Sequence, residues 1–125
     1  MTNRKFSWKE RGNSFGYAWQ GIEALFRTEH NAWIHAGLTV AAVTLSLVLK
    51  ISRTEITLLI IAMSLVWITE IINTAIEKAM DFISKEKHPQ IGLVKDLAAA
   101  AVLIAAIAAL IIGVIIFLPK LLNYA

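Results

Sequence analysis

Three apolar runs dominate the pattern of hydrophobic and polar positions along this chain. Residues 31–49 are interrupted only by His35 and short hydroxyl side chains, residues 56–69 carry no charge over 14 positions, and residues 97–118 carry none over 22. A helix needs about 20 apolar residues to cross a bilayer, so the second run becomes long enough only by taking in Glu70. The pattern predicts three membrane-spanning helices, at about residues 31–50, 56–76 and 95–118.

The segment before these runs has apolar and polar residues on opposite sides of a helix. The apolar side carries Phe15, Ala18, Trp19, Ile22, Leu25 and Phe26, and the polar side carries Asn13, Gln20, Glu23 and Arg27. This pattern is typical of a helix in the membrane interface, and the simplest interpretation is an anchor with no further role. We predict an all-α integral membrane protein with one domain, residues 1–125: an N-terminal amphipathic surface helix at about residues 7–29, and three transmembrane helices.

Polar breaks separate the predicted helices. Residues 50–55 form the turn after the first span, where Thr54 is a candidate helix cap. Nothing interrupts the second helix until about Ser84, so it should run past the bilayer. Residues 88–92 contain Pro and Gly and are expected to form a turn, with the third helix beginning near Leu93.

Charge is distributed unevenly between the two sides that three spans create. The side of the N-terminus carries nine of the 12 basic residues (Arg4, Lys5, Lys9, Arg11, Arg27, Lys78, Lys85, Lys87 and Lys95), and the other side carries Lys50, Arg53 and Lys120. Basic residues favour the cytoplasmic side, so we expect the N-terminus and the connection between the last two spans there. The net charge of +3 is interpreted as attraction to lipid headgroups, without a nucleic-acid partner.

Polar side chains form a stripe on the second span. Glu70, Asn73 and Glu77 fall within an arc of about 60° on a helix, and Asp81 continues the stripe one turn later. An ionisable group inside the bilayer costs at least about 2.5–3.5 kcal/mol. Groups retained at that cost usually serve ions, protons or phosphates, so the stripe is the main candidate for chemistry.

Eight of the nine acidic residues lie on the predicted cytoplasmic side. Oxygen ligands of this kind suit a hard divalent cation such as Mg²⁺, which also binds substrate phosphates. Simpler interpretations exist: Glu77 or Asp81 could pair with Lys78 or Lys85, and Asn73 could link two helices. The three histidines lack ligand spacing, so no histidine metal site is expected, and neither glycine-rich nucleotide motif occurs.

The motif Glu70-Ile-Ile-Asn73-Thr-Ala-Ile-Glu77-x-x-x-Asp81, followed by Glu86-x-His88 and by Lys95-Asp96, resembles the prokaryotic diacylglycerol kinase family. Gly16-Tyr17-Ala18-Trp19 and Glu29 also fit, and the resemblance covers roughly residues 8–118. It implies a homotrimeric enzyme of the bacterial inner (cytoplasmic) membrane, with active sites between subunits on the cytoplasmic side. Such enzymes move the ATP γ-phosphate onto a lipid alcohol.

The resemblance also implies separate roles for individual residues. Glu70 is expected to be the catalytic base that takes the lipid hydroxyl proton, and Glu29 and Glu77 are expected to hold Mg²⁺. The implied nucleotide contacts are Tyr17, Glu29, Asn73, Glu77, Glu86, His88, Lys95 and Asp96, and the implied lipid contacts are Trp19, Glu70 and Ala99.

The identity of the lipid stays open between two alcohols, diacylglycerol and undecaprenol. Ala98-Ala99 stand where enteric-type members have Gly-Ser, which makes this chain more similar to the branch that includes undecaprenol kinases. A non-catalytic alternative is a small cation or proton conductor with Glu70 and Asn73 lining a pore. A conductor has no need of Glu86 or Lys95, and the outer half of the spans offers only Ser, Thr and apolar residues.

Overall fold

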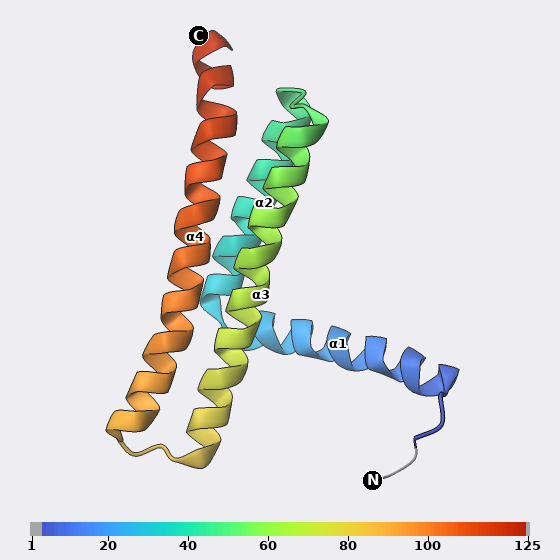
Figure 1. The fold of residues 1–125 in the computed structure, drawn as a ribbon, viewed down its shortest axis with the longest axis vertical. Coiled ribbons are helices and arrows are strands. Elements are labelled where there is room, and N and C mark those ends of the chain that lie inside the picture. The colour runs from blue at the N-terminus through green and yellow to red at the C-terminus, as the bar shows by residue number, and fades with distance from the viewer. Residues whose placement is uncertain (1–3, 125) are drawn as a thin grey trace.

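The computed structural model describes residues 4–124 as four helices and no strand (Figure 1). They are α1 (Trp8–Thr28), α2 (His30–Val48), α3 (Arg53–Ile83) and α4 (Pro89–Tyr124). By length and composition, the last three are able to cross a membrane. The predicted all-α class with a surface helix and three spans is thereby confirmed.

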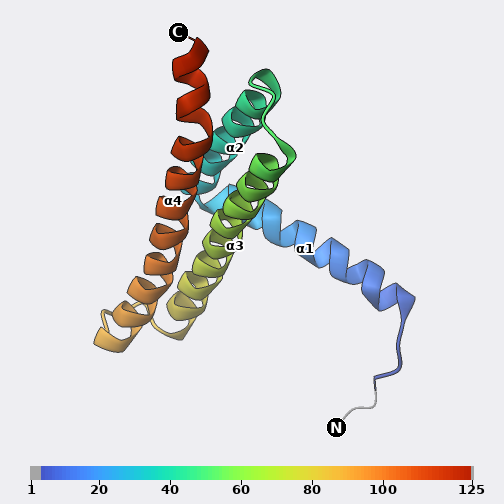
Figure 2. The ribbon, with the colours of Figure 1, turned by 45° about the horizontal axis from the view of Figure 1, so that its top comes forward.

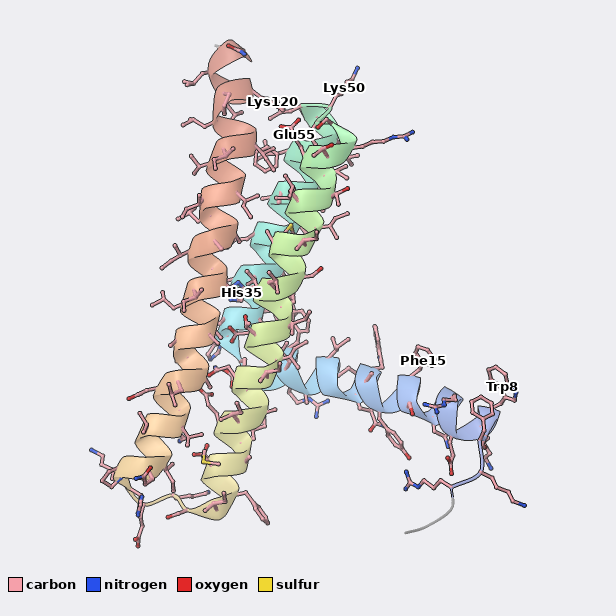
Figure 3. All side chains as sticks on the ribbon, in the orientation of Figure 1. Trp8, Phe15, His35, Lys50, Glu55 and Lys120 are labelled. Carbon is pink, nitrogen blue, oxygen red and sulfur yellow. The ribbon has the colours of Figure 1, made fainter. Side chains whose placement is uncertain are left out.

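The helices α3 and α4 form a long antiparallel hairpin, and α2 lies beside α3 (Figures 1 and 2). The amphipathic α1 leaves this bundle at the level where α2 begins, and runs across the direction of the hairpin. Its Trp8 and Phe15 point toward the side on which α2 extends (Figure 3). An interfacial helix turns its apolar side chains toward the membrane, as expected for an amphipathic helix of this kind. The α3–α4 hairpin extends past the level of α1 on the side away from α2 (Figure 1).

Two ion pairs between α3 and α4 occur near opposite ends of the hairpin. Lys95 Nζ lies 2.7 Å from Asp81 Oδ1, and Lys120 Nζ lies 3.3 Å from Glu55 Oε1. The paired residues are 26 positions apart on α3 and 25 apart on α4, so both pairs fit one antiparallel register. This register places Glu77 and Asp81 of α3 opposite residues 95–101 of α4, which are rich in alanine.

The capping residue of α3 is Ser52, so the prediction of Thr54 is wrong. Ser52 has an extended backbone, and its side chain accepts a hydrogen bond from the Glu55 N–H at 3.1 Å. Glu55 Oε1 accepts one from the Ser52 N–H, also at 3.1 Å, which completes a capping box. Thr54 is already inside the helix and is unable to serve as its cap.

The predicted turn at residues 88–92 is also wrong, because α4 begins at Pro89. Proline fits the first position of a helix, where its missing N–H would have no partner. The side chain of His88 accepts a hydrogen bond from the Gln90 N–H at 3.2 Å and so supports this start. The hairpin turn therefore consists of residues 84–88, and Gly92 lies within α4.

We expect Ser52→Ala to lower the free energy of unfolding by about 1 kcal/mol, since it removes the cap of α3. The matched control is Thr54→Ala two positions later, which removes a hydroxyl without a capping role. Thermal unfolding of both variants in one detergent measures the difference. Equal stability losses in the two variants would contradict the assignment of the cap.

Candidate active site

The deepest polar residue of the stripe is Glu70, which is only 2% exposed. Its Oε2 lies 3.5 Å from Nε2 of His35 on α2. Since His35 is five residues past the start of α2, this pair lies about 7.5 Å from that end of the helix. Glu70 thus lies near the start of α2, and its neighbour His35 belongs to a different helix.

The next two residues of the stripe contact each other. Asn73 Nδ2 donates a hydrogen bond to Glu77 Oε1 at 3.3 Å, and both side chains are half-buried. Among the described residues, neither Asn73 Oδ1 nor the buried Thr74 Oγ1 has a hydrogen-bond partner. Buried polar oxygens normally have partners, so these atoms are available to water or to a ligand.

A cavity of about 550 Å³ lies at the hairpin turn. It is lined by Asp81, Ser84, Lys85, Glu86, Lys87, His88, Pro89, Ile91, Gly92 and Lys95. We call it the hairpin pocket. Its volume falls in the usual range for small-molecule sites, and its three lysines give it positive charges that suit phosphate groups.

Asp81 and Lys95 meet inside the hairpin pocket, beyond the apolar part of α3. The hydrogen bond that the Lys95 ammonium donates to Asp81 lowers the pKa of that carboxyl. Both side chains are substantially exposed, so the pair contributes little to stability. The alternative pairing of Asp81 with Lys78 or Lys85 along one helix is not the one observed: the close contact reaches across to α4.

The hairpin pocket brings together three of the residues predicted to contact nucleotide, Glu86, His88 and Lys95. Asp96 is exposed on α4 beside them and does not line the pocket. Ala99 is exposed one turn further along α4, and Glu29 lies half-buried at the break between α1 and α2.

The two predicted site residues on α1 lie apart from the hairpin pocket. Tyr17 is 68% exposed and Trp19 is 63% exposed, and the Trp19 indole donates a hydrogen bond to Glu23 at 2.7 Å. The only buried residue of α1 is Leu25, near its C-terminal end. Most of α1 therefore extends away from the bundle, as Figure 2 shows, and carries these two residues with it.

Residues 4–124 contain no group of three or more His, Asp and Glu side chains close enough to hold a metal ion. The roles of Glu29 and Glu77 as metal ligands stay predictions. Two oxygen donors beside each other on α3 are the Glu77 carboxylate and the unpaired Oδ1 of Asn73. This donor set matches the preference of Mg²⁺ for one or two carboxylates completed by water and phosphate.

Aromatic residues join α1, α2 and α3 close to Glu70. Phe26 packs edge-on against Trp33 at 5.1 Å between ring centroids, and its ring is tilted against that of Trp67 at 5.7 Å. Trp67 Nε1 also donates a hydrogen bond to Thr39 Oγ1 on α2 at 3.0 Å. No local pattern in the sequence links Trp67 to these partners, because they lie on other helices.

Comparison with known proteins shows several relatives. A family model described as prokaryotic diacylglycerol kinase matches residues 16–117. A diacylglycerol kinase from Synechocystis is 39% identical over 96% of this chain and 71% of that protein. The undecaprenol kinase of Bacillus subtilis is 37% identical, covering 86% of this chain and 88% of its own. The diacylglycerol kinase of Escherichia coli is 41% identical, with 77% and 79% covered.

Proposed function

Because this chain belongs to the prokaryotic diacylglycerol kinase family and is a lipid kinase of the membrane, we propose that it transfers the γ-phosphate of ATP to diacylglycerol or undecaprenol. The products are phosphatidate or undecaprenyl phosphate. One observation carries the proposal: the buried carboxylate of Glu70 lies on the same helix, α3, that ends at a pocket lined by lysines. A lipid hydroxyl arrives from the membrane and a polyphosphate from water, and this arrangement spans that boundary.

Phosphoryl transfer depends mainly on positioning and on charge neutralisation. In the proposed step, the Glu70 carboxylate accepts the proton of the lipid hydroxyl. The lipid oxygen forms a bond to the γ-phosphorus as the bond from that phosphorus to the β–γ bridging oxygen breaks, and ADP leaves. Glu77 lies about 10 Å from Glu70 along the α3 axis, on the side of the hairpin pocket.

We propose that Mg²⁺ accompanies ATP and is held by Glu77, with Glu29 as the second carboxylate. The unpaired Oδ1 of Asn73 and its amide contact with Glu77 support this assignment, since a hard cation prefers such oxygen atoms. When bound, Mg²⁺ neutralises charge that develops on the phosphates. Asn73 holds the Glu77 carboxylate in place.

We also propose that the enzyme works as a homotrimer with its site between subunits. The extended α1 supports this proposal, because Tyr17 and Trp19 lie away from the hairpin pocket of their own chain. In a trimer, Tyr17 and Trp19 of one copy could reach the hairpin pocket of a neighbouring copy. Their predicted roles at the active site would then agree with their position on α1. Cross-linking in membranes, with trimers as the expected product, tests the assembly.

The active site is proposed to face the cytoplasm of the bacterial inner membrane. Lys50 and Lys120 lie together at the opposite end of the bundle from the hairpin pocket, as Figure 3 shows for the labelled residues. The greater number of basic residues is at the pocket end, and this asymmetry favours a cytoplasmic location. Labelling of single cysteines placed at the two ends checks the orientation.

The proposed activity is tested by supplying the purified protein with labelled ATP and Mg²⁺, and with diacylglycerol and undecaprenol in separate reactions. We expect label in at least one lipid, and its loss when EDTA removes the metal. Transfer to neither lipid by folded protein would contradict the proposed substrates. Transfer that persists in EDTA would contradict the Mg²⁺ requirement.

A further inference from the structure

His35 is the closest charged or potentially charged neighbour that the structure gives to Glu70. Its Nε2 lies 3.5 Å from Glu70 Oε2, and the two side chains are 17% and 3% exposed. The partners come from different helices and are 35 positions apart in the chain. The family motif analysed above contains Glu70 and does not contain His35.

Glu70 needs such a neighbour for a physical reason. A carboxyl that is 2% exposed has no solvent to fix its direction, and a base must aim one oxygen at the hydroxyl that it deprotonates. An imidazole N–H beside one carboxyl oxygen restrains the group and leaves the other oxygen available. The 3.5 Å separation is long for a hydrogen bond, and catalytic contacts often shorten when substrate is bound.

The position of His35 is itself fixed by contacts one turn away. The Trp67 indole donates a hydrogen bond to Thr39, and the Trp67 ring lies 6.1 Å from the His35 ring. The Thr39 hydroxyl in turn donates to the backbone carbonyl of His35 at 2.7 Å. This set of polar contacts joins α2 to α3 at the height of Glu70.

His35 also borders the membrane-facing side of the site. It lines one end of an apolar groove of about 350 Å³ between α2, α3 and α4, together with Thr39, Val66 and Trp67. Glu70 does not line this groove. His35 therefore lies next to both the Glu70 carboxyl and this groove.

We propose that His35 is a positioning residue for phosphate transfer, which holds the Glu70 carboxyl by a hydrogen bond from Nε2. This inference rests on the proposed function, in which Glu70 is the base. His35 is not assigned any contact with substrate or metal. Because His35 acts by orienting Glu70, its substitution should lower kcat and leave the binding of ATP unchanged.

The test compares His35→Leu with His35→Gln, whose side-chain amide keeps a donor at a similar reach. Supporting groups that orient a functional ligand typically change its effect by about 10–100-fold, so we expect kcat to fall by that factor in His35→Leu. We expect KM for ATP to stay within about twofold, and His35→Gln to recover most of kcat. The control is His30→Leu, which alters an exposed histidine at the start of the same helix.

Several results would overturn the proposal. Unchanged kcat in His35→Leu would do so, as would an equal loss in His35→Gln, because the donor is then irrelevant. A loss of kcat accompanied by a raised KM for ATP would show a general structural defect. The shorter carboxylate of Glu70→Asp lies farther from His35. If His35→Leu lowers kcat by the same factor in Glu70→Asp as in the unmodified protein, the two residues act independently.

A spectroscopic measurement separates this proposal from the proposed lipid kinase reaction. The ¹⁵N resonance of His35 Nε2 should shift in Glu70→Gln and stay unchanged in Glu55→Gln, at the far end of α3. No shift in Glu70→Gln would overturn the pairing, even if the wild-type protein phosphorylates lipid. Conversely, a wild-type protein that transfers no phosphate would contradict the proposed function, and the resonance would still report on the pair.

Discussion

Glu77→Gln should reduce phosphate transfer by about 10²–10³-fold, which is the scale of losing one group that stabilises transition-state charge. The substitution keeps the shape of the side chain, and its amide oxygen still accepts the hydrogen bond from Asn73 Nδ2. Only the negative charge of the proposed metal ligand is removed. The measurement is transfer from labelled ATP to lipid at several Mg²⁺ concentrations, with part of the loss recovered at high Mg²⁺.

Glu55→Gln is the matched control for Glu77→Gln, since it makes the same change at the other end of the same helix. Glutamine still fits the capping box with Ser52, so the start of α3 is kept. We expect Glu55→Gln to retain turnover although it loses its ion pair with Lys120. Equal transfer by Glu77→Gln and Glu55→Gln would show that Glu77 does not hold the metal.

Periodicity along the chain was sufficient to predict the type of every helix. The length of the apolar runs identified three spans, and the two-sided pattern at about residues 7–29 identified α1, which is observed at Trp8–Thr28. These features are local, because each reports how one segment meets lipid or water. Helix ends were predicted less well: Ser52 and His88, not Thr54 and Leu93, mark the starts of α3 and α4.

Contacts between helices were the part of the site that the sequence did not predict. Glu70 was identified as unusual from its place in an apolar run, and its partner His35 was missed. Pairing of Asp81 along α3 was only the simpler alternative, and the observed partner, Lys95 on α4, was not predicted. A single sequence defines the faces of each helix, whereas the register between helices depends on turns and packing along their whole length.

The order of the polar side chains along α3 explains how one helix can approach both a membrane lipid and a water-soluble nucleotide. Glu70 is buried, Asn73 and Glu77 are half-buried, and Asp81 is exposed at the hairpin pocket. This gradient follows the passage from lipid to water. A conductor would need strongly polar groups through the whole span, but residues 56–69 of α3 offer only Ser, Thr and apolar residues, in agreement with the membership in a lipid kinase family.

Glu70→Gln should lower kcat by about 10²–10⁴-fold, the usual contribution of a general base, and should leave ATP binding unchanged. Glutamine has nearly the same volume, and its amide oxygen remains able to accept a hydrogen bond from His35. The variant also removes an ionisable group from the apolar layer, where such a group is costly. We therefore expect thermal stability in detergent to be equal to or higher than that of the unmodified protein.

The combination of lost turnover with kept or raised stability is what distinguishes a catalytic carboxylate from a structural one. A structural Glu70 that held α2 to α3 through His35 would give a less stable protein on conversion to Gln, with ATP binding and turnover falling together. Transfer assays, ATP titrations and unfolding curves on the same preparation separate the two cases. Normal turnover in Glu70→Gln would exclude Glu70 as the base, and the proton of the lipid hydroxyl would then need another acceptor.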